Sequence, residues 1–296
     1  MNVFVRRRLV LSIVVATLTV ALHPPVVSAA QNFLWKVTGK GTVVYLAGSI
    51  HMLTPDFYPL TPPFDTAFKD SDVLVEEVDL AEMLRPEAQM QTLMRGMLPA
   101  GQTLDKVLSA ETLALVNKTA KEGGAPVEAL QRLKPWMLAL TLEGLELVKS
   151  GFNPELGLDK HFYDRAREAG KAVQGLETVE YQISRLDDMT AEQQDRMLAE
   201  TLKEISTQKG SVAKLTAAWK TGDASAVERV VLADLKSDPL MYQRLLVERN
   251  KNWMPKIEAL FARKGNALVI VGAAHLVGPD GLLAMLKAKG YTIAQL

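Results

Sequence analysis

Two copies of the pattern Gly-x-x-His hold the residues of this sequence that are best suited to chemistry. They are Gly48-Ser-Ile-His51 and Gly272-Ala-Ala-His275. Each follows directly after an apolar run, 43–47 or 267–271, of the kind that forms a strand buried on both faces. Histidine is a frequent metal ligand and general base. Because both histidines occur in the same uncommon pattern, we predict that the two motifs lie on two sides of a single site.

The alternative for each histidine is an ordinary hydrogen-bonded residue at the end of a strand. The chain has four histidines. His23 lies near the N-terminus, and His161 falls within a predicted helix, where we expect a structural role. One Gly-x-x-His motif says almost nothing, but two of them, each directly after an apolar run, are moderately specific. We therefore predict that His51 and His275 bind a metal ion or take part in catalysis.

An acidic pair, Glu76-Glu77, lies near the end of a third apolar run, 73–78. A buried carboxylate needs a compensating partner. A divalent cation held by two imidazoles and one carboxylate would provide it, and would leave positions open for water. A salt-bridged or helix-capping carboxylate is the alternative. Because adjacent strand residues point to opposite faces, we expect Glu77 at the site and Glu76 facing solvent or an arginine.

Three further polar residues are candidates of second rank. Glu177 ends a predicted strand, Asp159 follows Gly157 closely, and Arg249 lies near the end of a predicted helix. Residues of these types form salt bridges more often than they catalyse reactions. Arg249 could neutralise a carboxylate or a developing oxyanion, because a guanidinium group keeps its charge and binds oxygen atoms in pairs.

The first strands and helix that are expected to position these residues lie in the N-terminal part of the chain. Residues 33–37 and 42–47 flank a glycine-containing turn, which predicts a β-hairpin. A helix at 62–70 and a strand at 73–78 follow. Strand, helix and strand form a βαβ unit, which implies parallel pairing and a right-handed crossover. Ligands bind beyond the carboxyl ends of such strands, which is where the candidate residues are expected.

The rest of the chain is mostly helical in its apolar spacing from about residue 80 to 265. It predicts helices at 83–98, 103–122, 126–149, 158–169, 190–208, 211–220, 223–236 and 239–262, with one strand at 172–177. Strand 267–271, helix 279–289 and strand 291–294 complete the chain. We therefore predict an α/β fold of α+β character. Its central mixed or parallel sheet is built from both chain ends, with a large, mostly helical insertion at about 80–265.

Composition narrows the possible functions. The chain has 296 residues, of which 48% are hydrophobic and 23% charged, as in an ordinary globular protein. Its 34 basic and 34 acidic residues balance, and no basic stripe is present, which argues against a nucleic-acid partner. Cysteine is absent, so any metal would be held by nitrogen and oxygen, and a cysteine nucleophile is excluded.

The first 29 residues are typical of a secretory signal peptide. Three arginines at 6–8 precede an apolar run at 9–22, and small residues follow at 27–30. We predict cleavage after Ala29 or Ala30, which leaves 30–296 as a single domain. An uncleaved membrane anchor is the alternative, but the run is short for a span of about 20 residues. No later stretch is apolar for long enough, so we expect no stable span after cleavage.

Beyond these patterns, the sequence resembles the TraB/PrgY/GumN family, which includes the Tiki metalloproteases, and in particular its GumN-like branch of exported bacterial proteins. The resemblance runs from about residue 32 to the C-terminus. The residues that carry it are Phe33-Leu-Trp35, Gly48–His51, Phe57–Leu60, Val75–Asp79, Gly175–Thr178, Glu248–Asn250 and Gly272–Gly278. One departure is Glu76, which precedes the family glutamate where relatives usually carry an apolar residue.

The resemblance implies an erythromycin-esterase-like or Tiki-like fold and a metal-dependent hydrolase. Carried over by position, the metal ligands would be His51, Glu77 and His275, with Mn, Co or Zn as the ion and a periplasmic location. We expect a peptidase acting on a peptide or small-molecule substrate. Glu77 could bind the metal or act as general base, and Arg249 and Glu177 are the other catalytic candidates. The alternatives are a periplasmic metal- or ligand-binding protein without turnover, and a helical interaction protein.

Overall fold

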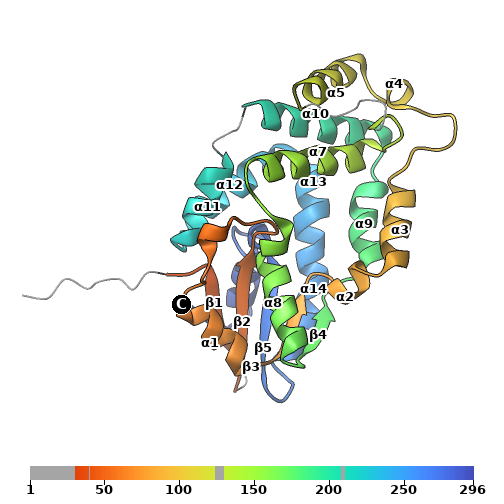
Figure 1. Cartoon of the computed structure of the whole chain (residues 1–296). Coiled ribbons are helices and arrows are strands. Elements are labelled where there is room, and N and C mark those ends of the chain that lie inside the picture. The colour runs from red at the N-terminus through yellow and green to blue at the C-terminus, as the bar shows by residue number, and fades with distance from the viewer. Residues whose placement is uncertain (1–30, 40, 124–129, 208–210) are drawn as a thin grey trace, which may run out of the picture.

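A six-stranded sheet lies at the centre of the structure, a computed structural model that describes residues 31–39, 41–123, 130–207 and 211–296 (Figure 1). The strand order is β4-β3-β5-β2-β1-β6. The strands are β1 (Leu34–Gly39), β2 (Thr42–Ser49), β3 (Ser71–Glu76), β4 (Ala172–Gly175), β5 (Asn266–Gly272) and β6 (Thr292–Gln295). Strands from both ends of the chain build this sheet, as predicted.

Pairing within the sheet confirms the hairpin and corrects the βαβ prediction. β1 pairs with β2 antiparallel, and β6 adds to the other side of β1, also antiparallel. The strands β2, β5, β3 and β4 are parallel neighbours in that order. β2 and β3 therefore do not pair directly, because β5 lies between them. The interior of β5, residues 267–271, is buried throughout, and a strand buried on both faces belongs in the middle of a sheet.

Helices cover the sheet and fill the long segment between β3 and β5. Those outside the segment are α1 (Pro62–Asp70) and α15 (Leu282–Ala288). Those within it are α2 (Leu80–Met83), α3 (Pro86–Arg95), α4 (Leu104–Val107), α5 (Ala110–Gly123), α7 (Pro135–Lys149), α8 (Leu158–Glu168), α9 (Val179–Asp187), α10 (Ala191–Thr207), α11 (Ser211–Lys220), α12 (Ala224–Ser237), α13 (Pro239–Tyr242) and α14 (Glu248–Leu260). Short helices η1 (Pro55–Phe57), η2 (Pro154–Leu156), η3 (Gln243–Val247) and η4 (Ala273–His275) complete the connections.

The predicted helical insertion is present, with several changes in its boundaries. The helix predicted at 83–98 is divided at Pro86, which starts α3, and the one predicted at 126–149 begins at Pro135. Proline favours the first turn of a helix and lacks the N–H needed further in. The start predicted at residue 126 lies outside the described residues. Helix α9 was not predicted, although Thr178 caps it by accepting a hydrogen bond from the Tyr181 N–H.

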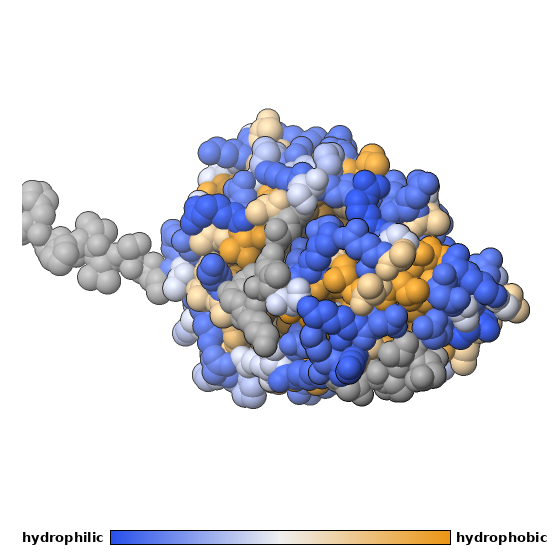
Figure 2. All heavy atoms as spheres, turned by 90° about the horizontal axis from the view of Figure 1, so that it is seen from above, coloured by the Kyte–Doolittle hydropathy of each residue, from blue (hydrophilic) through white to orange (hydrophobic). Residues whose placement is uncertain are grey.

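The insertion has an apolar core separate from the core around the sheet. It lies among α4, α5, α7 and α10, which Figure 1 shows together at one end of the molecule. Its fully buried members include Leu104, Val116 and Leu138. Apolar side chains also emerge among polar ones on the face seen from above (Figure 2). Among the described residues, no helix has the length and apolar character needed to cross a membrane.

The glycine of the first Gly-x-x-His motif makes room for a core side chain. A Cβ on Gly48 would lie 2.2 Å from Cδ1 of Phe33 and 3.1 Å from Cα of Ala273. Phe33 is fully buried, so its ring has little space into which to move. Gly48 therefore allows β2, the Phe33 ring and the start of η4 to pack closely together.

We predict that Gly48→Ala lowers the free energy of unfolding by about 1–3 kcal/mol, as overpacking of a core does. Urea unfolding measures the change. Gly144→Ala is the matched control, because Gly144 lies within α7 and a Cβ there meets nothing within 4 Å. The control is expected to raise the stability by about 0.5–1 kcal/mol, since alanine favours a helix more than glycine does. An unchanged stability for Gly48→Ala would contradict this account.

Candidate functional site

His51 lies just past the end of β2 and is oriented by Asp159. The Nδ1 atom of His51 is 3.2 Å from Oδ1 of Asp159, a residue in the first turn of α8. The hydroxyl of Ser49 donates to the same oxygen at 2.5 Å. The start of α8 is also joined to this loop, because the Leu158 N–H donates to the Ile50 carbonyl at 3.2 Å. Asp159 thus holds Nδ1, and Nε2 of His51 has no hydrogen-bond partner among the described residues.

This pair carries opposite charges. The Asp159 carboxylate raises the pKa of His51 to about 9. Burial alone would raise the pKa of Asp159, but the His51 charge and the bonds from His51 and Ser49 hold it below its ordinary value. The His51 side chain is 63% exposed, so water screens this attraction. The pair therefore orients the His51 ring more than it stabilises the fold.

His275 ends the short helix η4, directly after β5, and is buried. Its Nδ1 lies 2.7 Å from Oδ1 of Asn250. The Asn250 amide nitrogen donates to the carbonyls of His275 and Asp280, at 3.2 and 2.8 Å. Since that nitrogen is a donor, the Asn250 oxygen accepts, and Nδ1 of His275 carries the proton. Burial lowers the pKa of His275 to about 3, so the ring is neutral and its Nε2 is an acceptor.

Glu77 follows β3 and points toward both histidines. Its Oε1 accepts from the Gly272 N–H at 2.7 Å and lies 3.9 Å from Nε2 of His275. Its Oε2 accepts from Arg249 at 2.5 Å and from Gln182 at 3.2 Å. Burial alone would raise the pKa of Glu77, but the Arg249 charge and the other donors outweigh it and lower the pKa to about 2. Glu77 is therefore an ionised carboxylate.

Arg249 connects three of the predicted residues. Its guanidinium donates to Glu77, to Glu177 from Nη2 at 2.7 Å, and to Nε2 of His275 at 3.0 Å. Glu177 also accepts from the indole N–H of Trp253 at 2.8 Å. Arg249 lies at the start of α14, directly after the π-helical turn η3, and not near the end of a helix as predicted. Its suggested role of neutralising a carboxylate matches these contacts.

The second glycine motif marks the point at which the site converges. A Cβ on Gly272 would lie 3.2 Å from Oε1 of Glu77, 3.6 Å from Cδ2 of His275 and 3.8 Å from Nε2 of His51. The three residues predicted as metal ligands thus meet around one position, although they come from the ends of three different strands. The sheet places β5 between β2 and β3, and this order brings the two motifs to the same edge.

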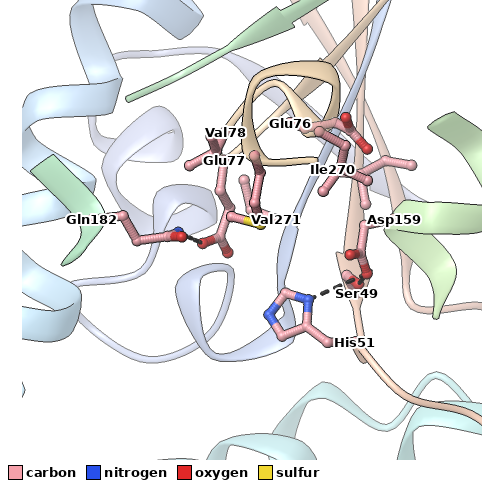
Figure 3. Close-up of a pocket in the computed structure, with 11 residues that line it drawn as sticks. Ser49, His51, Glu76, Glu77, Val78, Asp159, Gln182, Ile270 and Val271 are labelled. Carbon is pink, nitrogen blue, oxygen red and sulfur yellow. Dashed lines mark hydrogen bonds and ion pairs between the residues drawn. The ribbon is translucent and has the colours of Figure 1, made fainter. Parts of the chain in front are cut away.

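A pocket of about 260 Å³ opens beside this point (Figure 3). It is lined by Ser49, His51, Glu76, Glu77, Val78, Leu80, Met83, Asp159, Gln182, Ile270 and Val271. Figure 3 shows Glu76 and Asp159 on one side of the pocket, and Glu77 and Gln182 on the other. Gln182 was not predicted, because it lies on the unpredicted helix α9. Asn250, also missed, directly follows Arg249 in the sequence.

The structure corrects the prediction for Glu76. We expected this side chain to face solvent or an arginine, but the residue is only 2% exposed and has no arginine partner among the described residues. The reason is that α8 packs against β3, β4 and β5 and covers this face of the sheet. Burial, followed by the charge of Asp159, raises the pKa of Glu76 to about 9.

The donor atoms around Gly272 fit a divalent cation in chemical type. A neutral His275 that donates from Nδ1 and accepts at Nε2 has the arrangement usual for a metal-binding histidine. His51 has its Nδ1 bonded to a carboxylate in the same way, but a cation must replace the proton on its Nε2. However, no three His, Asp or Glu side chains within the described residues are spaced as a preformed metal site. Arg249 contacts both Glu77 and His275, so a cation must displace some of these contacts.

Comparison with known proteins shows which protein family this chain belongs to. The sequence model of the TraB/PrgY/gumN family matches residues 33–295. This chain belongs to the TraB/PrgY/gumN family. Two family relatives are called "uncharacterized protein YbaP", one from Escherichia coli K12 and one from Shigella flexneri. Each is 28% identical over 243 residues, which cover 82% of this chain and 87% of the relative. No solved structure matches the chain significantly.

Membership in the TraB/PrgY/gumN family confirms the resemblance drawn from the sequence. The matched range contains all six predicted site residues, His51, Glu77, Asp159, Glu177, Arg249 and His275. The structure joins four of them, Glu77, Glu177, Arg249 and His275, in one hydrogen-bonded network. His51 and Asp159 form a separate pair, and the His51 ring approaches the network at Gly272. His161, for which we expected a structural role, lies outside this network and packs its ring against Tyr58 and Phe162.

Proposed function

We propose that this member of the TraB/PrgY/gumN family is an exported, metal-dependent hydrolase that acts on peptides. The observation that carries the proposal is the meeting of His51 Nε2, Glu77 Oε1 and the His275 ring around the position of Gly272. Two nitrogen donors and a carboxylate form a common ligand set of catalytic metal ions. The adjoining pocket gives a substrate access to this point.

A bound divalent cation would supply a Lewis acid and lower the pKa of its water toward neutrality. The residues of the chain prepare the site for it. Asp159 fixes the His51 ring through Nδ1, and Asn250 fixes the His275 ring in the same way. Glu77 would help to hold the cation or would accept a proton from water. Arg249, which now contacts Glu77 and His275, would place a permanent positive charge beside the reacting group.

Export is part of the proposal and rests on the N-terminal sequence. The charged start, the apolar run of 9–22 and the small residues at 27–30 are features of a cleaved leader. A periplasmic location follows for a bacterial protein of this kind. Metal ligands of nitrogen and oxygen suit such an oxidising compartment, because they do not form disulfides.

A cleavage assay tests the proposal. The purified protein is treated with EDTA, and then Mn²⁺, Co²⁺ or Zn²⁺ is added before it meets a peptide library. We expect that EDTA removes activity and that one of these ions restores it. Absence of cleavage with every ion, together with stoichiometric metal in the protein, would overturn the hydrolase assignment. That result would instead support the alternative of a periplasmic metal-binding protein without turnover.

A further inference from the structure

Glu76 is a buried carboxyl group that the proposed chemistry does not use. The residue is 2% exposed, and neither of its carboxyl oxygens has a partner with full hydrogen-bond geometry in the part of the chain that the structure describes. The backbone N–H of Leu80 interacts with the carboxyl group only weakly. Glu76 nevertheless lines the pocket that reaches His51 and Glu77. Buried polar groups in proteins are nearly always paired, so an unpaired one at a pocket wall indicates a missing partner.

The charges around Glu76 indicate what kind of partner this is. The neighbouring charges with the largest effect on Glu76 are those of Asp159, Asp79 and Asp164, which are all acidic. The positive charge of His51, on the same pocket, is paired with Asp159. Asp159 already accepts hydrogen bonds from His51 and Ser49. A positively charged group that enters the pocket would supply the partner that the Glu76 carboxyl lacks, and Asp159 would attract it as well.

The remaining wall of the pocket indicates what carries the positive charge. Five of the lining residues are apolar: Val78, Leu80, Met83, Ile270 and Val271. The pocket volume of about 260 Å³ is below the range of about 300–1,000 Å³ that is usual for drug-sized ligands. A single flexible side chain suits this space. An aliphatic stem with a cationic end would contact the apolar wall along its length and the acids at its tip.

We propose that Glu76, with Asp159 beside it, forms a specificity subsite for a basic side chain, lysine or arginine, of the substrate peptide. The subsite rests on the proposed function, because it adjoins the point where the scissile bond would lie. The two sides of the pocket then have different roles. Glu77 and Gln182 lie on the side of the reacting group, and Glu76 selects the side chain.

Binding of two matched probes tests the subsite without turnover. The probes are N-acetyl-lysine methylamide and N-acetyl-norleucine methylamide, which differ at the end of the side chain. Calorimetry or NMR titration measures their affinities for the wild type and for Glu76→Gln. We expect the wild type to bind the lysine probe at least tenfold more tightly than the norleucine probe. In Glu76→Gln, which keeps the size of the side chain and removes its ability to carry a charge, the ratio should fall to within twofold of one.

Glu143→Gln is the control, because Glu143 lines a separate cavity between α7, α10 and α11. It should keep the lysine preference. Equal affinities of the wild type for the two probes, or an unchanged preference in Glu76→Gln, would overturn the subsite and leave Glu76 as a buried residue of the fold. The wild-type comparison remains decisive even where the variant does not fold. A lysine preference without cleavage of any lysine peptide would retain the subsite and reject the hydrolase.

Discussion

Replacing Arg249 by leucine is expected to lower the free energy of unfolding by about 3–5 kcal/mol, the usual effect of removing one partner from a buried ion pair. Arg249 donates to Glu77 and to Glu177, and all three side chains are nearly buried. Without the guanidinium, two carboxylates face each other in a poorly solvated region, and the acceptor atom of His275 also loses its donor. Urea unfolding followed by circular dichroism measures the loss.

Two further variants show whether the loss comes from buried charge. Lys289→Met breaks the pair with Glu258, whose atoms are 3.0 Å apart but substantially exposed, and should cost less than about 1 kcal/mol. Adding Glu177→Gln to Arg249→Leu should recover part of the stability, because it removes one of the unpaired charges. An Arg249→Leu protein that unfolds like the wild type would show that the network contributes little to the fold.

Replacing His51 or His275 by alanine is expected to reduce both metal content and peptide cleavage by about 100-fold or more, since even residues that only orient a ligand change metal affinity by about 10–100-fold. His51→Ala is the cleaner test, because its ring is largely exposed and its loss should leave the fold intact. His275→Ala also removes the acceptor of Arg249. Mass spectrometry of the bound metal and the library assay give the two readouts.

His161→Ala provides a matched control for these histidine variants. His161 lies on α8, where its ring is 4.9 Å from that of Tyr58, and it takes no part in the convergence around Gly272. Its metal content and cleavage rate should stay at the wild-type level. Wild-type metal content and activity in both His51→Ala and His275→Ala would refute the proposed centre.

The sequence predicted correctly those features that depend only on neighbouring residues in the chain. An apolar run that stops at a glycine, or at an acidic pair, predicts where a buried strand ends. His51, Glu77 and His275 could therefore be assigned to the carboxyl ends of strands before the structure was known. The hairpin of β1 and β2 and the helix α1 also follow local rules of turns and proline positions. These signals are contained within about ten residues each.

Features that depend on a distant segment could not be predicted. β5 lies between β2 and β3 because its apolar interior is buried on both faces, which favours a central position in the sheet. That preference can be judged only when all the strands are compared. The burial of Glu76 depends on α8, which packs over that face from more than eighty residues away. Alternation along a strand correctly separated the faces of Glu76 and Glu77, but it could not show that both faces are covered.

The position of β5 has a consequence for how the molecule is made. β2 and β3 are synthesised early, yet the strand that joins them is among the last segments of the chain. Until it arrives, both present open edges that invite pairing with other chains, and the residues of the first motif have no counterpart. A chain that lacks β5 therefore cannot bring the two Gly-x-x-His motifs to one edge of the sheet.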